Sequence, residues 1–137
     1  MKNFNNKVAA ITGAGSGIGQ QLAVLLAKQG CHLALSDVNE QGLLKTLELI
    51  KDTGVRATLD KVNVADLEEV RAWAEKVEQD HGSINMIFNN AGVALGSTVE
   101  GASYDELEWI VGINFWGVVY GTKEFLPRIK KTGDGHV

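Results

Sequence analysis

The sequence predicts an α/β fold: a doubly wound parallel sheet between two layers of helices, with the strand order 3-2-1-4 and a fifth strand only begun. Short apolar runs of strand length alternate with amphipathic segments of helix length along the whole chain. Capping residues and glycines mark the junctions between them. Crossover connections in such sheets are right-handed, which leaves few ways to arrange four units of this kind. We therefore expect a three-layer sandwich.

Length and composition indicate one globular domain over residues 1–137. The hydrophobic fraction is 45% and the charged fraction is 22%, which are ordinary values for a globular protein. The net charge of -4 gives no electrostatic footprint for nucleic acid, whose binders carry clustered lysine and arginine. We expect no nucleic-acid partner.

The first unit is a strand, a helix and a second strand. The strands are predicted over 7–12 and 32–37. Gly30 stands where a left-handed cap would end the helix between them. The apolar residues of this helix recur at helical spacing and are Ile18, Leu22, Leu25 and Leu26.

The second helix is expected to begin after Asn39, a good N-cap residue, and to be closed by Gly54. The third strand is predicted over 57–62. The apolar residues of the helix are Leu43, Leu44, Leu47 and Ile50.

The third helix follows a capping pattern, Asp66 with Glu69, and is closed by Gly82. A fourth strand is predicted over 84–89. The apolar residues of the helix are Val70, Trp73, Ala74 and Val77.

A long helix over 103–130 is predicted next, because Ser103 and Glu106 form a capping box at its start. Pro127, the only proline, is expected to end or kink this helix. Residues 135–137 have the character of a fifth strand that is just beginning.

The turn between the first strand and the first helix has the pattern T-G-x-x-x-G-I-G over 12–19. In a sheet of this kind the chain must reverse sharply here, let a pyrophosphate approach its backbone and pack helix against strand. The N-terminus of the helix favours the phosphates. A flexible loop in which glycines recur by chance is the alternative. The cofactor contacts expected in this turn are Gly13, Ser16, Gly17, Ile18 and Gly19.

Asp37 ends the second strand, 18 residues beyond Gly19, near the spacing of about 20 at which an acid receives the ribose hydroxyls of NAD. Its charge would repel the extra phosphate of NADP, and neither Ser16 nor Val38 supplies a cation for that phosphate. A Rossmann-type site that prefers NAD to NADP is therefore predicted. An ordinary turn aspartate is the alternative.

Four segments, in this order and spacing, resemble the N-terminal half of the short-chain dehydrogenase/reductase family. They are the turn 12–19, Asp37, Asn89-Asn90-Ala91-Gly92 after the fourth strand, and Asn114 within Ile113-Asn114-Phe115-Trp116-Gly117. The resemblance implies an NAD(P)-dependent oxidoreductase that transfers hydride between the dinucleotide and an alcohol or carbonyl substrate. This chain would supply the cofactor-binding half.

The resemblance implies further cofactor contacts after the third and fourth strands. Asn90, Ala91 and Gly92 would line the cofactor cleft and steady the sheet, although a plain turn would also explain them. Asn63 and Val64 would meet the adenine, at a place where the family often has an acid instead of the asparagine.

Asn114 is the candidate catalytic residue. The resemblance makes it the first member of an Asn, Ser, Tyr, Lys set, in which it supports a proton relay to the lysine. From the residues alone, an amide in an apolar helix must be hydrogen-bonded, so a core asparagine that fixes helix packing is the alternative. The other three members would follow Val137, and Tyr120 with Lys123 has the wrong spacing and place. The 137-residue chain alone is therefore expected to be inactive.

The segment 107–120 is apolar on almost every side, which predicts burial on both sides of the long helix. In the resembled family this helix packs against its mate, so a homo-oligomer formed through 103–130 is expected. Burial against a further part of the protein is the alternative.

A non-catalytic module that binds a dinucleotide or a protein partner is the second class of function, beside the oxidoreductase. The presence or absence of residues after Val137 would separate the two classes.

Cys31 is the only cysteine, so no internal disulfide and no cysteine metal cluster are expected, and a cytoplasmic location fits. The segment 1–7 lacks the features of an export signal. The apolar stretch 109–120 is too short for a membrane span, so no membrane partner is expected.

Overall fold

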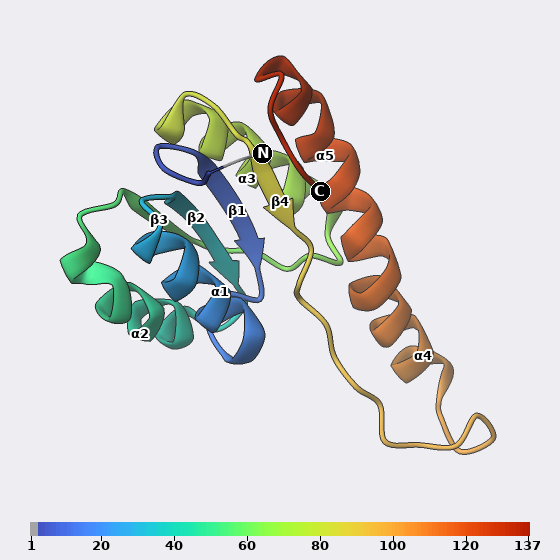
Figure 1. Cartoon of the computed structure of the whole chain (residues 1–137). Coiled ribbons are helices and arrows are strands. Elements are labelled where there is room, and N and C mark those ends of the chain that lie inside the picture. The colour runs from blue at the N-terminus through green and yellow to red at the C-terminus, as the bar shows by residue number, and fades with distance from the viewer. Residues whose placement is uncertain (1–2) are drawn as a thin grey trace.

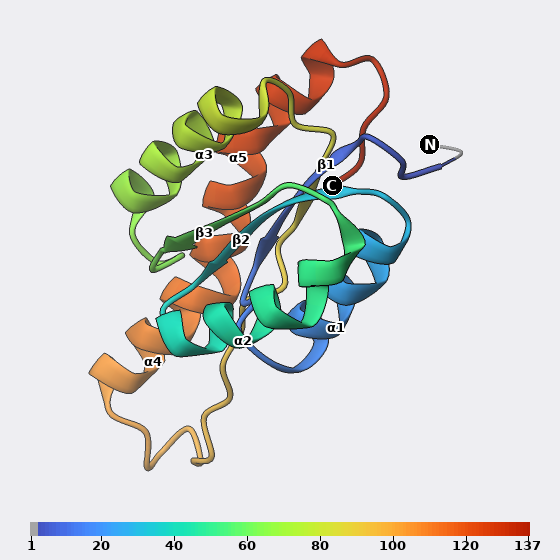
Figure 2. The same cartoon turned by 90° about the vertical axis from the view of Figure 1, so that its left-hand side faces the viewer.

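The computed structural model describes residues 3–137 and contains a parallel sheet of four strands in the order β3-β2-β1-β4. Helices α1 and α2 cover one face of the sheet, and α3 and α5 cover the other (Figure 1, Figure 2). The predicted strand order and the three layers are confirmed. The strands are β1 (Val8–Thr12), β2 (His32–Asp37), β3 (Ala57–Lys61) and β4 (Met86–Phe88).

The helices alternate with the strands as the sequence predicts. A 3-10 turn, Lys51–Thr53, extends α2, and a π turn, Gly112–Trp116, joins α4 to α5. The helices are α1 (Gly17–Lys28), α2 (Glu40–Ile50), α3 (Leu67–His81), α4 (Tyr104–Val111) and α5 (Gly117–Lys131).

Most of the predicted caps form. The side chain of Asn39 accepts a hydrogen bond from the backbone of Gly42, and Ser103 forms a full capping box with Glu106. The three predicted closing glycines have left-handed φ values: 77° at Gly30, 75° at Gly54 and 78° at Gly82. Local chemistry therefore sets these helix ends.

The capping pattern predicted for Asp66 with Glu69 forms only in part. The Asp66 carboxylate accepts hydrogen bonds from the backbone of Glu68 and Glu69, as a cap should. The Glu69 carboxylate, however, accepts from the backbone N–H of Asn63 at 2.7 Å and so does not return to Asp66. The backbone N–H of Asp66 instead donates to the carbonyl of Asn63 at 3.0 Å.

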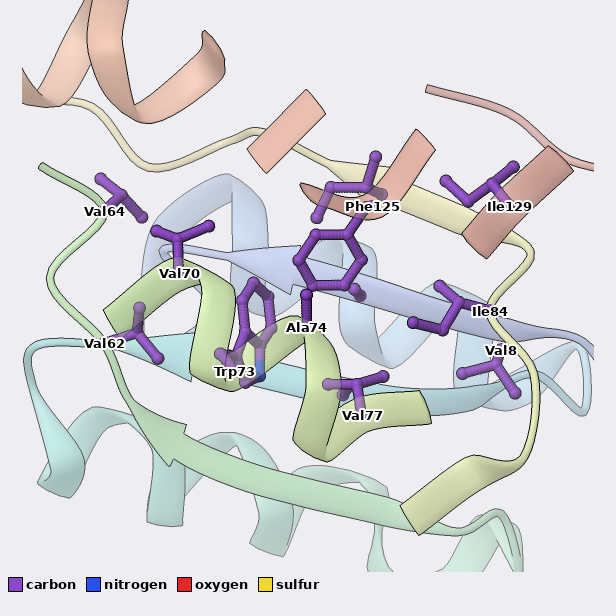
Figure 3. Packing of buried hydrophobic residues seen from close by; sticks show 13 residues of the cluster. Val8, Val62, Val64, Val70, Trp73, Ala74, Val77, Ile84, Phe125 and Ile129 are labelled. Carbon is purple, nitrogen blue, oxygen red and sulfur yellow. The ribbon is translucent and has the colours of Figure 1, made fainter. Parts of the chain in front are cut away.

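The central strand β1 is buried on both faces, as expected for a parallel sheet covered by two helical layers. Its residues alternate between two cores: Ala9 and Ile11 face α1 and α2, whereas Val8 and Ala10 face α3 and α5. In the second core Trp73 of α3 packs against Phe125 of α5, with ring centroids 4.8 Å apart (Figure 3).

The apolar stripe predicted for helix α1 faces the sheet only in part, since Leu26 is buried and Leu22 packs against the core while the other two residues do not. Ile18 is 79% exposed and Leu25 is 62% exposed, whereas the buried residues are Gly19, Ala23, Leu26 and Ala27. Three of these four are small, which lets the helix backbone come close to the sheet. The size of the side chains therefore decides the buried face here more than their hydrophobicity does.

The long helix departs from the prediction at its proline. Pro127 does not end it, because α5 runs through this residue to Lys131. The irregular point is the π turn Gly112–Trp116. In the single chain Trp109, Phe115 and Trp116 are 47%, 57% and 45% exposed, so burial of this side by a partner or a further part of the protein stays a prediction. Only the inner side of α5 packs on the sheet, through residues such as Phe125.

The predicted start of a fifth strand is confirmed. His136 forms a parallel bridge with Met86 beside β4. The backbone N–H of Ile87 donates to the carbonyl of His136 at 3.2 Å, and that of His136 donates to the carbonyl of Asn85 at 2.9 Å. Residues 135–137 thus lie along the free edge of β4.

Within residues 3–137, the helices are all too short or too polar to cross a lipid bilayer. Met1 and Lys2, which begin the segment 1–7, lie outside the described residues. Cys31 is buried in the core, and burial raises the pKa of its thiol to about 11. This cysteine packs as a small apolar residue.

Candidate cofactor site

A cleft of about 360 Å³ opens where the carboxyl ends of the strands meet. This is the edge at which parallel α/β sheets bind ligands. The turn after β1, the end of β2, the residues after β3 and those after β4 all contribute to it. Every predicted cofactor contact except Gly19 lines the cleft. Its lining residues are Gly13, Ser16, Gly17, Ile18, Asp37, Val38, Val62, Asn63, Val64, Asn90, Ala91, Gly92, Val93 and Ile113.

Gly19 lies behind the cleft wall, where α1 crosses the turn. A Cβ atom at Gly19 would overlap the carbonyl oxygen of Gly13 and lie 2.6 Å from the amide nitrogen of Asn90. Gly13 itself has a φ of 65°, and a Cβ atom there would lie 2.9 Å from the Cα atom of Ala91. Both glycines therefore allow close backbone packing, which is one of the roles predicted for this turn.

The side chain of Asn90 holds the turn from the β4 side. Its amide nitrogen donates to the carbonyl oxygens of Thr12 and Gly13, at 2.9 and 3.3 Å. The N-terminus of α1 is left open by contrast, because Ser16 occupies the N-cap position but its side chain makes no capping bond within residues 3–137. The first N–H groups of α1 are therefore free to receive an anion.

Asp37 stands at the end of β2 with both carboxylate oxygens engaged. One oxygen accepts from the backbone N–H of Gly15 at 2.9 Å, and the other accepts from that of Asn39 at 2.9 Å. Each carboxylate oxygen has a second lone pair for a ligand hydroxyl. Among the described residues that line the cleft there is no lysine or arginine, so Asp37 is the only charged side chain there.

Thr12 links the turn to the segment after β4, whereas the sequence predicts it only as the strand end that opens the turn 12–19. Its side chain is buried, and the hydroxyl oxygen accepts from the backbone N–H groups of Asn90 and Ala91, both at 2.9 Å. The hydroxyl proton is directed to the carbonyl of Phe88 at 3.3 Å. A hydroxyl residue directly before the first glycine is the one signal that could have suggested this role.

Some of the residues after β3 and β4 line the cleft, and others form hydrogen bonds that hold neighbouring elements together. The Asn63 side-chain oxygen accepts from the backbone of Ala65 at 3.1 Å, while Asn63 also lines the cleft. Asn89 turns away from the cleft, and its amide nitrogen donates to the hydroxyl of Thr122 on α5 at 3.1 Å. Asn90 to Gly92 face the cleft.

Asn114 lies in the π turn and is exposed, which differs from the core position considered in the sequence analysis. Its side chain forms a pair of hydrogen bonds with the backbone of Val93: the oxygen accepts from the N–H at 2.9 Å, and the nitrogen donates to the carbonyl at 2.8 Å. The asparagine thus ties the segment after β4 to the long helix, close to Val93 and Ile113 in the cleft wall.

Comparison with known proteins agrees with this geometry. The model of the short chain dehydrogenase family matches residues 7–137. SadH of Mycobacterium tuberculosis, named as an oxidoreductase, is 44% identical over 137 residues, which are 100% of this chain and 50% of SadH. The chain therefore spans about half the length of this curated relative.

Two solved structures share the fold closely. A short chain dehydrogenase/reductase from Burkholderia phymatum in complex with NAD has a TM-score of 0.93 and 34% identity, and the match covers 98% of this chain and 48% of that one. An alcohol dehydrogenase from Thermococcus sibiricus complexed with 5-hydroxy-NADP has a TM-score of 0.90 and 34% identity, covering 95% and 56%. The chain described here belongs to the short-chain dehydrogenase family.

Proposed function

We propose that the chain binds NAD in this cleft, as the cofactor-binding half of an enzyme that transfers hydride between NAD and an alcohol or carbonyl substrate. The observation that carries the proposal is the carboxylate of Asp37 at the cleft, on the strand next to the glycine turn. When bound, the nicotinamide would supply the hydride chemistry. The chain's own residues would hold and orient the dinucleotide.

The cleft residues fit such a ligand. The open N-terminus of α1, at Gly17 and Ile18, would receive the pyrophosphate, and Asp37 would accept the ribose hydroxyls. Asn63 and Val64 would flank the adenine at the other end of the cleft. The remaining contacts in this proposal come from Gly13, Ser16, Gly19, Asn90, Ala91 and Gly92.

The two similar structures contain NAD in one case and an NADP analogue in the other, so the choice between the cofactors rests on the cleft itself. Asp37 would repel a 2′-phosphate, and the lining offers it no cation. We expect the 137-residue chain to bind NAD about tenfold or more tightly than NADP, because a like-charge contact near a protein surface costs on the order of 1–2 kcal/mol.

Isothermal titration of both cofactors measures this preference. Asp37→Asn should bring the two affinities together, because the charge goes while one oxygen can still accept from Gly15. Asp52→Asn makes the same charge change on an exposed turn outside the cleft and should leave the ratio unchanged. Tighter binding of NADP by the natural sequence would contradict the role of Asp37.

Hydride transfer itself would need the family's serine, tyrosine and lysine, so we propose it for a protein of the relatives' full length. Asn114 would support the proton relay there. Its side chain pairs with the backbone of Val93, so it would act by holding the segment after β4 against the long helix beside the cleft. Alcohol-dependent formation of NADH by such a protein tests the proposal, and its absence across a range of alcohols would count against it.

We also propose a homo-oligomer formed through the α4–α5 segment. Phe115, Trp116 and Tyr120 form a run of aromatic rings on this segment, with centroids 5.2 and 5.6 Å apart, and Phe115 and Trp116 are 57% and 45% exposed. An exposed apolar patch of this kind marks an interaction surface.

Sedimentation velocity should therefore show the natural sequence as a dimer or larger species, and Trp116→Arg should shift it toward the monomer. Leu25→Arg, at an even more exposed apolar residue on α1, is the control and should leave the mass unchanged. A monomeric natural sequence at tens of micromolar would refute this interface for the 137-residue chain.

A cytoplasmic location, which suits the single buried thiol of Cys31, is proposed as well and can be checked by cell fractionation.

A further inference from the structure

One face of helix α2 contacts the glycine turn on the side away from the cleft. This face consists of small and polar residues, and the leucine pattern of the helix does not predict it. Gly42 and Thr46 lie one helical turn apart on this face, and both are buried. A Cβ atom at Gly42 would lie 2.6 Å from the carbonyl oxygen of Gly15, so helix and turn meet at backbone distance. Thr46 stands directly beside this contact with 0% of its surface exposed.

The Thr46 hydroxyl joins three parts of the chain. Its proton has the carbonyl of Ala14, at 2.7 Å, as the nearer acceptor, while the carbonyl of Gly42 one turn earlier lies at 3.1 Å. The hydroxyl oxygen accepts from the side-chain amide of Gln20 on α1 at 3.0 Å. That same amide nitrogen lies 3.4 Å from the carbonyl oxygen of Gly15. Thr46 and Gln20 thus hold two successive carbonyls of the turn.

These hydrogen bonds fix the direction in which the peptide dipoles of the turn point. A carbonyl oxygen that faced the cleft would repel a phosphate, whereas an N–H group attracts it. The carbonyls of Ala14 and Gly15 are held on the α2 side, and the Asn90 amide holds those of Thr12 and Gly13. The turn can then present N–H groups, and not carbonyls, to an anion at the start of α1.

We infer that Thr46 is a positioning residue for the pyrophosphate of the cofactor, acting through the Ala14 carbonyl and through Gln20. The inference rests on the proposed function. Thr46 would not touch the ligand, because it does not line the cleft. Its effect should appear only in ligands that carry phosphates at the turn, since adenosine would be held by Asp37 and the residues after β3.

The test compares ligand fragments on the 137-residue chain. Thr46→Val keeps the size of the side chain but removes the hydroxyl, and with it the hydrogen bonds to the Ala14 carbonyl and from the Gln20 amide. We expect the dissociation constants of NAD and ADP to rise about tenfold and that of adenosine to stay within about twofold, as for the loss of one buried hydrogen bond. Thr46→Ser, which keeps the hydroxyl, should restore the affinity for NAD and ADP.

Two further variants keep the result interpretable. Thr53→Val removes a similar bond, from a threonine hydroxyl to the carbonyl of Ile50 at 2.6 Å, away from the turn, and should change none of the affinities. Gln20→Met removes the bonds from the Gln20 amide to the Thr46 hydroxyl and the Gly15 carbonyl. Because this side chain is half-buried, the variant tests the Gln20 part of the inference if Thr46→Val does not fold. It should also weaken ADP but not adenosine.

A folded Thr46→Val or Gln20→Met with unchanged affinity for ADP would overturn the inference, and so would an equal loss for ADP and adenosine. Failure of the natural sequence to bind either NAD or ADP would be a different result, since it would overturn the proposed function itself and the inference with it.

Discussion

Replacing Gly19 by alanine is expected to remove measurable NAD binding and to lower the free energy of unfolding by about 3 kcal/mol, the upper end for overpacking. The new methyl group would overlap the Gly13 carbonyl oxygen and lie 2.6 Å from the amide nitrogen of Asn90. The first of these is backbone, which cannot swing aside as a side-chain end can. Relief requires α1 to move away from the turn, and the proposed pyrophosphate site is built from the start of that helix.

Urea unfolding followed by circular dichroism gives the stability, and titration with NAD gives the affinity. Gly96→Ala is the matched control, because a Cβ atom at Gly96 meets nothing within 4 Å, and it should leave both quantities within error. Retention of NAD binding within about threefold in Gly19→Ala would mean that the turn and α1 do not pack as closely in solution as described here.

Replacing Thr12 by valine is expected to lower the free energy of unfolding by about 1–3 kcal/mol, the cost of leaving one N–H group without its acceptor. Valine has the same shape and suits a strand, so the packing of β1 is kept. The backbone N–H of Ala91 would lose its acceptor, whereas that of Asn90 keeps a second acceptor, the carbonyl of Phe88 at 2.9 Å.

Thr12→Ser keeps the hydroxyl and should recover most of the stability, which separates the hydrogen bonds from the missing methyl group. Urea unfolding of the three proteins measures this, and hydrogen exchange of the Asn90 and Ala91 amides reports the local bonds directly. A Thr12→Val protein as stable as the natural one, with the Ala91 amide still protected, would show that another acceptor takes over.

The elements that the sequence predicts best are those whose signals are local. β2 is found over the predicted range because Gly30 and Asp37 bound it on either side. The cap at Asn39 and the box at Ser103 depend on residues three positions away, so no distant contact is needed to see them. Most of the candidate site is predictable for the same reason, since its residues follow the ends of strands.

The features that the sequence hides depend on a distant partner. Pro127 costs a helix about 3 kcal/mol, yet it is flanked by Phe125 and Ile129, which are buried in the core and contribute about 1.5–3 kcal/mol each. Packing therefore outweighs the local rule. In the same way, nothing near Thr46 in the chain shows that its hydroxyl binds a backbone carbonyl 32 residues away.

Asp37 performs two tasks with one carboxylate. The oxygens that would receive the ribose also accept the N–H groups of Gly15 and Asn39, and these bonds help to shape the turn and the start of α2. An engineer who exchanges this acid for a basic residue to accept NADP would also release both N–H groups. Under the proposed function, cofactor preference would thus be coupled to the architecture of the glycine turn, and a change of preference would have to come with new partners for those two amides.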